Sequence, residues 1–281
     1  MQLPNFLLIG AYKAGTTSLH RYLREHPSVF MPRVKEPNFF ALEGGAGTTP
    51  GRDHETNIFE YHDYIRLFKE ADDETALGEA SPMYLQSPQA PVRIRHHIPH
   101  ARLLVSLRDP ADAIYSSYVM DVRDGYEQRS FSRVLEQLIH DLRVHPSGGP
   151  FYHQQLSRYY ALFPRHQIKV TLYDDLSRDA AAVVQTLFKH LEVDAGFRPD
   201  TQQVSNAGGM PRNRRFNTLL KRTAMGRRLP PTVSRRLSKL NTRPATKLSQ
   251  QHRARLIEIF REDMLQLQEM IQLDLGHWLA A

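Results

Sequence analysis

The chain has 281 residues, of which 41% are hydrophobic and 24% charged, a composition typical of a folded protein and unlike that of a disordered chain. The absence of cysteine excludes disulfides, zinc–thiolate sites, iron–sulfur clusters and cysteine nucleophiles, and no apolar run approaches the ~20 residues of a membrane-spanning helix. The net charge of +7 is uneven, because residues 212–247 carry 12 of the 37 Lys and Arg and no acidic residue, leaving 25 basic and 30 acidic residues elsewhere. This basic segment indicates an anionic partner or a solvated basic face.

Short apolar runs alternate with helical patterns along the chain. The runs predict buried strands at residues 6–9, 75–77, 103–107 and 168–172. The helical periodicity predicts helices at residues 17–24, 61–68, 111–120, 131–142, 152–163, 180–191 and 249–273. Strands separated by helices favour right-handed βαβ units. We therefore expect an α/β fold, a P-loop-like parallel β-sheet flanked by helices, formed as a single domain over residues 1–281 with helical insertions.

The first strand runs into a glycine-containing turn, residues 10–18. Gly10 and Gly15 have the spacing of the nucleotide-triphosphatase loop G-x-x-x-x-G-K-[ST], but Thr16 stands where that loop has its lysine. The lysine lies inside the loop instead, at Lys13. Backbone N–H groups of such a turn and of the helix start form a cradle for phosphate oxygens, and a lysine there reaches the oxygen that bridges a phosphate and a transferable group. The alternative is an ordinary strand–turn–helix with capping threonines.

A second segment, residues 102–120, carries a strand-end arginine. Arg108 follows the strand directly, and Ser116 lies eight residues later on the predicted helix. The planar guanidinium donates two parallel hydrogen bonds to a phosphate, so both side chains could face one anion. The alternative is a surface ion pair of Arg108 with Asp109 or Asp112.

Together, the loop and the Arg–Ser pair resemble the sulfotransferases that use 3′-phosphoadenosine-5′-phosphosulfate (PAPS). The resemblance covers nearly the whole chain and is greatest to the heparan-sulfate N- and 3-O-sulfotransferase branch and its bacterial relatives. Further segments are similar to motifs of that branch, at residues 35–40, 78–84, 172–176 and 273–278.

The resemblance implies a role for each matched residue. Arg108 and Ser116 would bind the 3′-phosphate, with Arg212 in the late loop (204–213) as a second contact, and Lys13 would also stabilise charge on the leaving phosphate. The 5′-phosphosulfate would be held by Lys13, Ala14, Gly15, Thr16, Thr17 and Ser18.

Glu36 matches the catalytic base of the branch and would take a proton from the acceptor. By itself it also fits a surface charge in a proline-containing loop, and Glu79 is the second candidate. His20 and His26 are expected to be packing or surface residues. The heparan-sulfate enzymes carry a lysine directly after the motif glutamate, whereas this chain has Ala80, so the geometry at the acceptor is expected to differ.

The resemblance implies transfer of a sulfuryl group from PAPS, with PAP as product and no metal, to a hydroxyl or amine of a carbohydrate, small natural product or lipid. The alternatives are a P-loop kinase that uses ATP and Mg²⁺, and a nucleic-acid binder. A nucleic-acid binder is not expected, because Phe216 is the only aromatic residue of the basic segment. Residues 212–247 could contact an anionic acceptor or a membrane surface. Residues 1–9 show no signal peptide, so we expect a cytoplasmic location. The sequence carries no signal for an oligomeric state.

Overall fold

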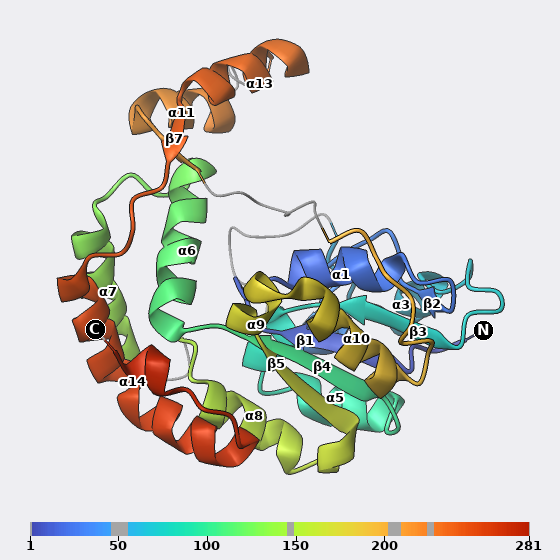
Figure 1. Cartoon of the computed structure of the whole chain (residues 1–281). Coiled ribbons are helices and arrows are strands. Elements are labelled where there is room, and N and C mark those ends of the chain that lie inside the picture. The colour runs from blue at the N-terminus through green and yellow to red at the C-terminus, as the bar shows by residue number, and fades with distance from the viewer. Residues whose placement is uncertain (1, 46–55, 145–148, 202–208, 224–227, 281) are drawn as a thin grey trace. The chain divides into compact units, whose positions relative to one another are not determined.

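The computed structural model describes residues 2–45, 56–144, 149–201, 209–223 and 228–280. The chain forms two compact units, each made of several segments (Figure 1). Unit 1 comprises residues Met1–Arg108, Phe151–Ser205 and Asp263–Asp274. Unit 2 comprises residues Asp109–Pro150, Asn206–Glu262 and Leu275–Ala281. The single-domain expectation stays a prediction.

Unit 1 is built on a parallel sheet of five strands in the order β2-β3-β1-β4-β5. Its strands are β1 (Phe6–Gly10), β2 (Val29–Phe30), β3 (Ala76–Ala80), β4 (Arg102–Leu107) and β5 (Ile168–Leu172). Its helices are α1 (Thr16–Arg24), α2 (Phe39–Leu42), α3 (Tyr61–Arg66), α4 (Met83–Gln86), α5 (Ala90–His97), α8 (Tyr152–Tyr160), α9 (Tyr173–Arg178) and α10 (Ala180–Leu191). The predicted α/β class with a helix-flanked parallel sheet is confirmed.

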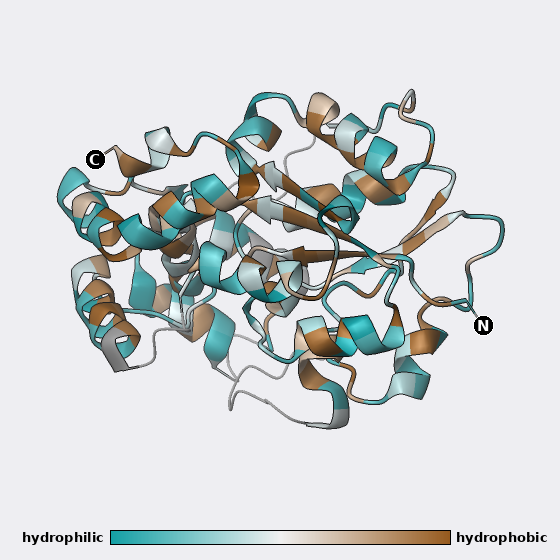
Figure 2. Cartoon of the chain, turned by 90° about the horizontal axis from the view of Figure 1, so that it is seen from below, coloured by the Kyte–Doolittle hydropathy of each residue, from teal (hydrophilic) through white to brown (hydrophobic). Residues whose placement is uncertain are grey.

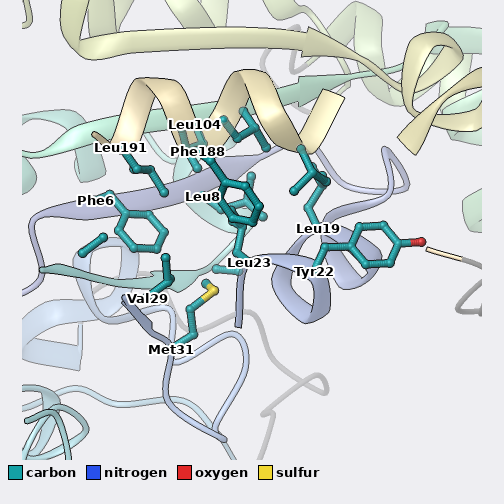
Figure 3. Packing of buried hydrophobic residues seen from close by; sticks show 14 of the residues in the cluster. Phe6, Leu8, Leu19, Tyr22, Leu23, Val29, Met31, Leu104, Phe188 and Leu191 are labelled. Atoms are coloured by element: carbon teal, nitrogen blue, oxygen red, sulfur yellow. The ribbon is translucent and has the colours of Figure 1, made fainter. Parts of the chain in front are cut away.

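The central strand β1 has all five residues buried, as expected for a parallel strand covered by helices on both faces. Phe6 and Leu8, which point to one face, pack with Leu19 of α1 and Phe188 of α10 (Figure 3). Burial of each such side chain contributes about 1.5–3 kcal/mol. Figure 2 shows hydrophobic and hydrophilic stripes on the same helices, the pattern that such one-sided packing requires.

A second packed group of unit 1 consists of aromatic rings. Phe39 stacks on Tyr64 with 4.6 Å between ring centroids, and Phe40 contacts Tyr84 at 5.5 Å. The Tyr159 hydroxyl donates a hydrogen bond to the Tyr84 carbonyl oxygen at 2.6 Å. This group joins α2, α3, α4 and α8.

Unit 2 is mainly helical, with a short antiparallel pair of strands. It contains α6 (Pro110–Arg123), α7 (Phe131–Val144), β6 (Gly209–Pro211), α11 (Arg214–Arg222), α13 (Pro231–Leu240), β7 (Thr242–Pro244) and the part of α14 (Gln250–Ile271) up to Glu262. Asp109 begins α6, because its Oδ1 accepts hydrogen bonds from the backbone N–H groups of Ala111 (2.7 Å) and Asp112 (3.4 Å). Arg253 of α14 pairs with the carboxylates of Asp109 and Asp112.

Some predicted boundaries are wrong. The strand predicted at residues 75–77 extends to Ala80, so that Glu79 lies within it. Gly78 and Glu79 are poor strand formers, but pairing with β1 overrides that preference. The helix predicted at residues 152–163 ends at Tyr160, ahead of Pro164, and the two-residue strand β2 and the short α2, α4 and α5 were not predicted.

Candidate functional site

The carboxyl ends of neighbouring parallel strands carry loop 10–18 and Arg108, which sequence reasoning selected, and two further polar residues. Loop 10–18 follows β1, Ser81 follows β3, Arg108 follows β4 and Tyr173 follows β5. In open α/β sheets, ligands bind outside the carboxyl ends of the strands. This edge is therefore the candidate site.

Loop 10–18 presents the start of α1 without a side-chain cap. Gly15, the residue before the helix, has a left-handed conformation (φ 82°) and, as a glycine, supplies no side-chain cap, and the first turn of the helix holds no acidic residue. A Cβ atom on Gly15 would lie 2.6 Å from Leu176 Cδ2 and 3.1 Å from the Tyr173 ring. Glycine is thus needed both for the backbone and for the packing. The uncapped N–H groups and the helix dipole fit an anion such as a phosphate.

Lys13 occupies a left-handed backbone conformation (φ 64°), and its side chain is half-buried. Arg108 fixes this part of the loop, since its Nη1 donates a hydrogen bond to the Lys13 carbonyl oxygen at 3.0 Å. The Arg108 guanidinium also lies over the Tyr173 ring, 4.4 Å from the centroid. Arg108, which follows β4, therefore contacts both the backbone of loop 10–18 and the ring of Tyr173, which follows β5.

The neighbouring residues are fastened by β4. The buried Ser106 hydroxyl donates a hydrogen bond to the Ala14 carbonyl oxygen at 2.6 Å, and the Ala11 N–H donates one to the Ser106 carbonyl oxygen at 2.7 Å. Thr16 is buried, Thr17 is exposed and Ser18 is half-buried. These hydrogen bonds hold the backbone of the loop against β4.

The alternative of a surface ion pair for Arg108 is not what the structure contains. Asp109 and Asp112 pair with Arg253, whereas Arg108 is engaged with the loop carbonyl and with Tyr173. The role of Arg108 in binding a phosphate stays a prediction.

Ser116 and Arg212 belong to unit 2. Ser116 lies half-buried on α6, and Arg212 is exposed directly after β6. The Arg212 backbone N–H donates to the Asn241 carbonyl oxygen at 2.5 Å. Their assignment to the 3′-phosphate stays a prediction. Residues 204–208 of the predicted late loop lie outside the described residues.

Glu36 lies beside the end of β3. Its backbone has a left-handed conformation (φ 61°), and its N–H donates a hydrogen bond to the Ala80 carbonyl oxygen at 3.0 Å. Its half-buried carboxylate pairs with the ammonium of Lys35. The backbone bond sets Glu36 at the same edge as loop 10–18, because β3 pairs with β1.

Glu79 lies fully buried beneath this segment. Its carboxylate accepts hydrogen bonds from the hydroxyls of Ser81 (2.8 Å) and Tyr64 (3.4 Å), and burial raises its pKa to about 7. The Ser81 hydroxyl in turn accepts a hydrogen bond from the Asn38 N–H at 3.1 Å. Through Ser81 and Asn38, Glu79 therefore stabilises the backbone next to Glu36. Its own carboxylate is buried and is not exposed to an acceptor.

His20 and His26 pack inside unit 1, as predicted. His20 is 8% exposed, and burial lowers its pKa to about 4, with a further contribution from the charge on Lys35. His26 is buried, and its Nε2 lies 3.0 Å from the Asp194 carbonyl oxygen. Neither histidine needs a role in proton transfer.

Sequence reasoning did not select Tyr173, Ser106 or Lys35 as members of this site. Tyr173 and Lys35 lie within segments that are similar to family motifs, and that similarity was the signal that could have singled them out. The role of Ser106 depends on its contact with Ala14, which the spacing of residues does not reveal.

Two kinds of feature are absent from the described residues. Within the described ranges, no three His, Asp or Glu side chains are grouped as metal ligands would be. None of the helices in these ranges combines the length and the apolar character that a membrane crossing requires.

Three known sulfotransferases illustrate the similarity of this chain to others. The crystal structure of a sulfotransferase from Alicyclobacillus acidocaldarius matches with a TM-score of 0.78 and 30% sequence identity over 99% of both chains. The membrane-associated sulfotransferase kil1 of Dictyostelium discoideum is 29% identical over half of this chain, and the mouse bifunctional heparan sulfate N-deacetylase/N-sulfotransferase 2 is 26% identical over 68% of it. The matches span only 28% and 22% of those two proteins.

A more distant structure shows the fold alone: mouse sulfotransferase SULT7A1 complexed with PAP matches with a TM-score of 0.55 at 12% identity. A sequence profile described as "Sulfotransferase family" matches residues 4–197, the range that contains loop 10–18, Glu36 and Arg108. The resemblance inferred from the loop and the strand-end arginine is confirmed, and the chain belongs to the sulfotransferase family.

Proposed function

We propose that this chain transfers a sulfuryl group from PAPS to a hydroxyl or amine of an acceptor, without a metal ion. The observation that carries the proposal is the fastened loop 10–18, with its uncapped helix start, its internal Lys13 and the Arg108 guanidinium bound to its backbone. Such a preorganised set of N–H donors and cations fits a phosphosulfate and needs no reorganisation during the reaction. The PAP in the SULT7A1 structure supports the same donor.

The chain's own residues divide the work as follows. The N–H groups from Ala14 to Ser18 hold the 5′-phosphosulfate, and Lys13 stabilises the negative charge that develops on the leaving phosphate. Arg108, with Ser116 and Arg212, binds the 3′-phosphate. When bound, PAPS supplies the sulfuryl group and leaves as PAP.

Glu36 acts as the general base. It takes the proton of the acceptor as the bond between sulfur and the acceptor atom forms and the bond between sulfur and the phosphate oxygen breaks. Its N–H bond to Ala80 and its ion pair with Lys35 hold the carboxylate at the sheet edge. Glu79 supports that position through Ser81 and Asn38.

The acceptor class is a carbohydrate or another small molecule. Relatives named as heparan sulfate N-sulfotransferases and as human carbohydrate sulfotransferase 15 support a carbohydrate. The side chain of Ala80 is fully buried in the core of unit 1, so the lysine that the heparan-sulfate enzymes carry there would not fit the same packing. We infer an acceptor held differently from heparan sulfate.

The test is a calorimetric titration with adenosine 3′,5′-bisphosphate in EDTA, compared with ATP and Mg²⁺. We expect tight metal-free binding of the bisphosphate, weakened by roughly 10- to 100-fold in Arg108→Ala because a charge-assisted hydrogen bond is lost. Arg102→Ala is the matched control, since Arg102 begins the same strand and pairs with Glu192. In a transfer assay with PAPS, Lys13→Ala should lower kcat by roughly 100- to 1,000-fold.

Preference for ATP with Mg²⁺ would contradict the proposal and favour a kinase. An equal loss of bisphosphate affinity in Arg102→Ala and Arg108→Ala would contradict the assignment of Arg108 to the phosphate site. Unchanged kcat in Glu36→Gln would remove Glu36 as the base.

A further inference from the structure

Helix α11 of unit 2 exposes part of its apolar face. Phe216 and Leu219 are 37% and 41% exposed, whereas Leu220 on the same face is buried. Asn217 anchors the helix, because its side-chain amide donates hydrogen bonds to the carbonyl oxygens of Val122 (3.2 Å) and Arg123 (2.9 Å) at the end of α6. The helix is thus held on one side and leaves two large apolar side chains in water.

Helix α13, which contacts α11, repeats this pattern. Val233 and Leu240 are 42% and 69% exposed, and with the half-buried Leu237 they fall on one helical face. Leu240 is the most exposed large hydrophobic side chain in the described part of the chain. Two neighbouring helices therefore each present an apolar face that unit 2 does not cover.

Basic side chains lie on these two helices and in the segments next to them. Some basic residues serve the fold of unit 2: Lys221 pairs with Asp124, and Arg214 donates to the carbonyl oxygens of Gln128 and Arg129. Others are exposed and, among the described residues, pair with no carboxylate. These are Arg215, Arg228, Arg236, Lys239, Arg243 and Lys247. We refer to these six together with Phe216, Leu219, Val233 and Leu240 as the basic apolar surface.

Exposed apolar side chains beside unpaired cations are the pattern of helices that lie in the interface of a lipid bilayer. The positive charges attract an anionic partner, and residues 212–247 contain no acidic residue that would repel it. Anionic polysaccharides or nucleic acids would satisfy the charges but offer little to cover Leu240 and Val233. A nucleic-acid platform would also need more aromatic residues than Phe216. We propose that the basic apolar surface binds the face of an anionic lipid bilayer.

Both components of the surface contribute to the expected affinity. Each Lys or Arg near an anionic leaflet strengthens binding by about fivefold, an effect that salt screens. Each apolar side chain that enters the acyl boundary adds an amount that salt does not remove. Binding should thus require anionic lipid, weaken in high salt and depend on the apolar side chains even at low salt.

The first experiment measures flotation of the full chain with vesicles of phosphatidylcholine alone and with about 30% phosphatidylserine. We expect binding to the anionic vesicles only. The double variants Val233→Ser/Leu240→Ser and Arg236→Gln/Lys239→Gln should each lower the partition coefficient at least about tenfold. The matched controls are Val92→Ser, 60% exposed in unit 1, and Lys69→Gln/Lys189→Gln; they should bind as the wild type does.

The second experiment asks whether α13 enters the bilayer. Trp278 is the only tryptophan and is 1% exposed, so a tryptophan introduced by Leu240→Trp reports on its own surroundings. We expect a blue shift of its emission and quenching by brominated lipids on anionic vesicles. The proposal is overturned if emission does not change, if Val233→Ser/Leu240→Ser binds like the wild type, or if phosphatidylcholine vesicles bind equally. Tight binding of heparin or an oligonucleotide by the wild type, without anionic vesicle binding, would assign the surface to a soluble polyanion.

Discussion

Loop 10–18 of unit 1 and the helices α11 and α13 of unit 2 both present positive charge, but they present it in different ways. In the loop, the donors are backbone N–H groups and two cations, fixed by Ser106, Arg108 and the packing under Gly15. On α11 and α13, Arg215, Arg236 and Lys239 carry their charge on long, exposed side chains that pair with no carboxylate of the described residues. The loop is a rigid cradle, whereas the helices are an adaptable surface.

This contrast predicts where single substitutions have large effects. A preorganised cradle fits one ligand geometry, so each fastening residue controls the binding of that ligand. A surface of exposed charges acts through the sum of many weak terms, so each single residue matters less. The following substitutions test how rigidly unit 1 is packed. The ion pairs of Arg253 with Asp109 and Asp112 provide the comparison in unit 2.

Gly15→Ala should have the largest effect. The left-handed backbone and the overlap of the new Cβ with Leu176 and Tyr173 should together lower the free energy of unfolding by about 3 kcal/mol. Gly44→Ala is the control, because Gly44 also has a positive φ (72°) but has nothing within 4 Å of its Cβ position. Urea denaturation measures the loss, and bisphosphate titration shows whether the cradle survives. Equal losses in the two variants would show that the packing under Gly15 is loose.

Two buried groups of unit 1 should give opposite pH effects. The pKa of Glu79 is raised from 4.5 to about 7, so the folded state binds more protons and stability falls as pH rises between those values. The pKa of His20 is lowered from 6.5 to about 4, so the unfolded state binds more protons and stability falls as pH decreases between those values. Each effect amounts to about 3 kcal/mol over its full range, and the two oppose each other where the ranges overlap.

Single variants should unmask these slopes in thermal unfolding measured across this pH range. Relative to the wild type, Glu79→Gln should make stability rise more with pH, and His20→Gln should make it fall more with pH. Slopes identical to that of the wild type in both variants would mean that neither group is buried as described.

Arg253→Ala tests the ion pairs that hold the start of α6 in unit 2. It leaves the buried carboxylate of Asp109 without its cation at the start of α6 and should lower the free energy of unfolding by about 2 kcal/mol. Arg255→Ala, two residues along the same helix, breaks an exposed pair with Glu136 and should leave the melting temperature unchanged. A larger effect of Arg255→Ala would reverse this ranking.

Ser106→Ala should have the smallest effect on stability. Loss of its hydrogen bond to the Ala14 carbonyl oxygen should cost about 1 kcal/mol and weaken bisphosphate binding a few-fold. Thr171→Val removes a comparable bond to the Val105 carbonyl oxygen, away from the loop. It should cost similar stability and leave bisphosphate affinity intact; a loss of affinity there would mean that the sheet as a whole, rather than Ser106, fixes the loop.

Much of unit 1 was predictable from the sequence because its signals are local. The strand at residues 6–9, the turn with Gly10 and Gly15 and the helix after it form one continuous pattern, and the structure contains them nearly as predicted. The strand from Arg102 to Leu107 and the helix that begins at Pro110 were equally clear. Short elements such as β2 were not predicted, because two residues are too few to show a hydrophobic periodicity.

The α/β sheet, the loop with Lys13 and the arginine at the end of β4 could be predicted from the order of residues, because each depends on residues that are neighbours along the chain. Contacts between distant residues were needed to show that Arg108 holds the loop while Arg253 pairs with the aspartates, and that Glu79 is buried while Glu36 lies at the sheet edge. Those assignments depend on which distant residues meet and how much water reaches them, and burial sets both the hydrogen bonds and the pKa of a carboxylate.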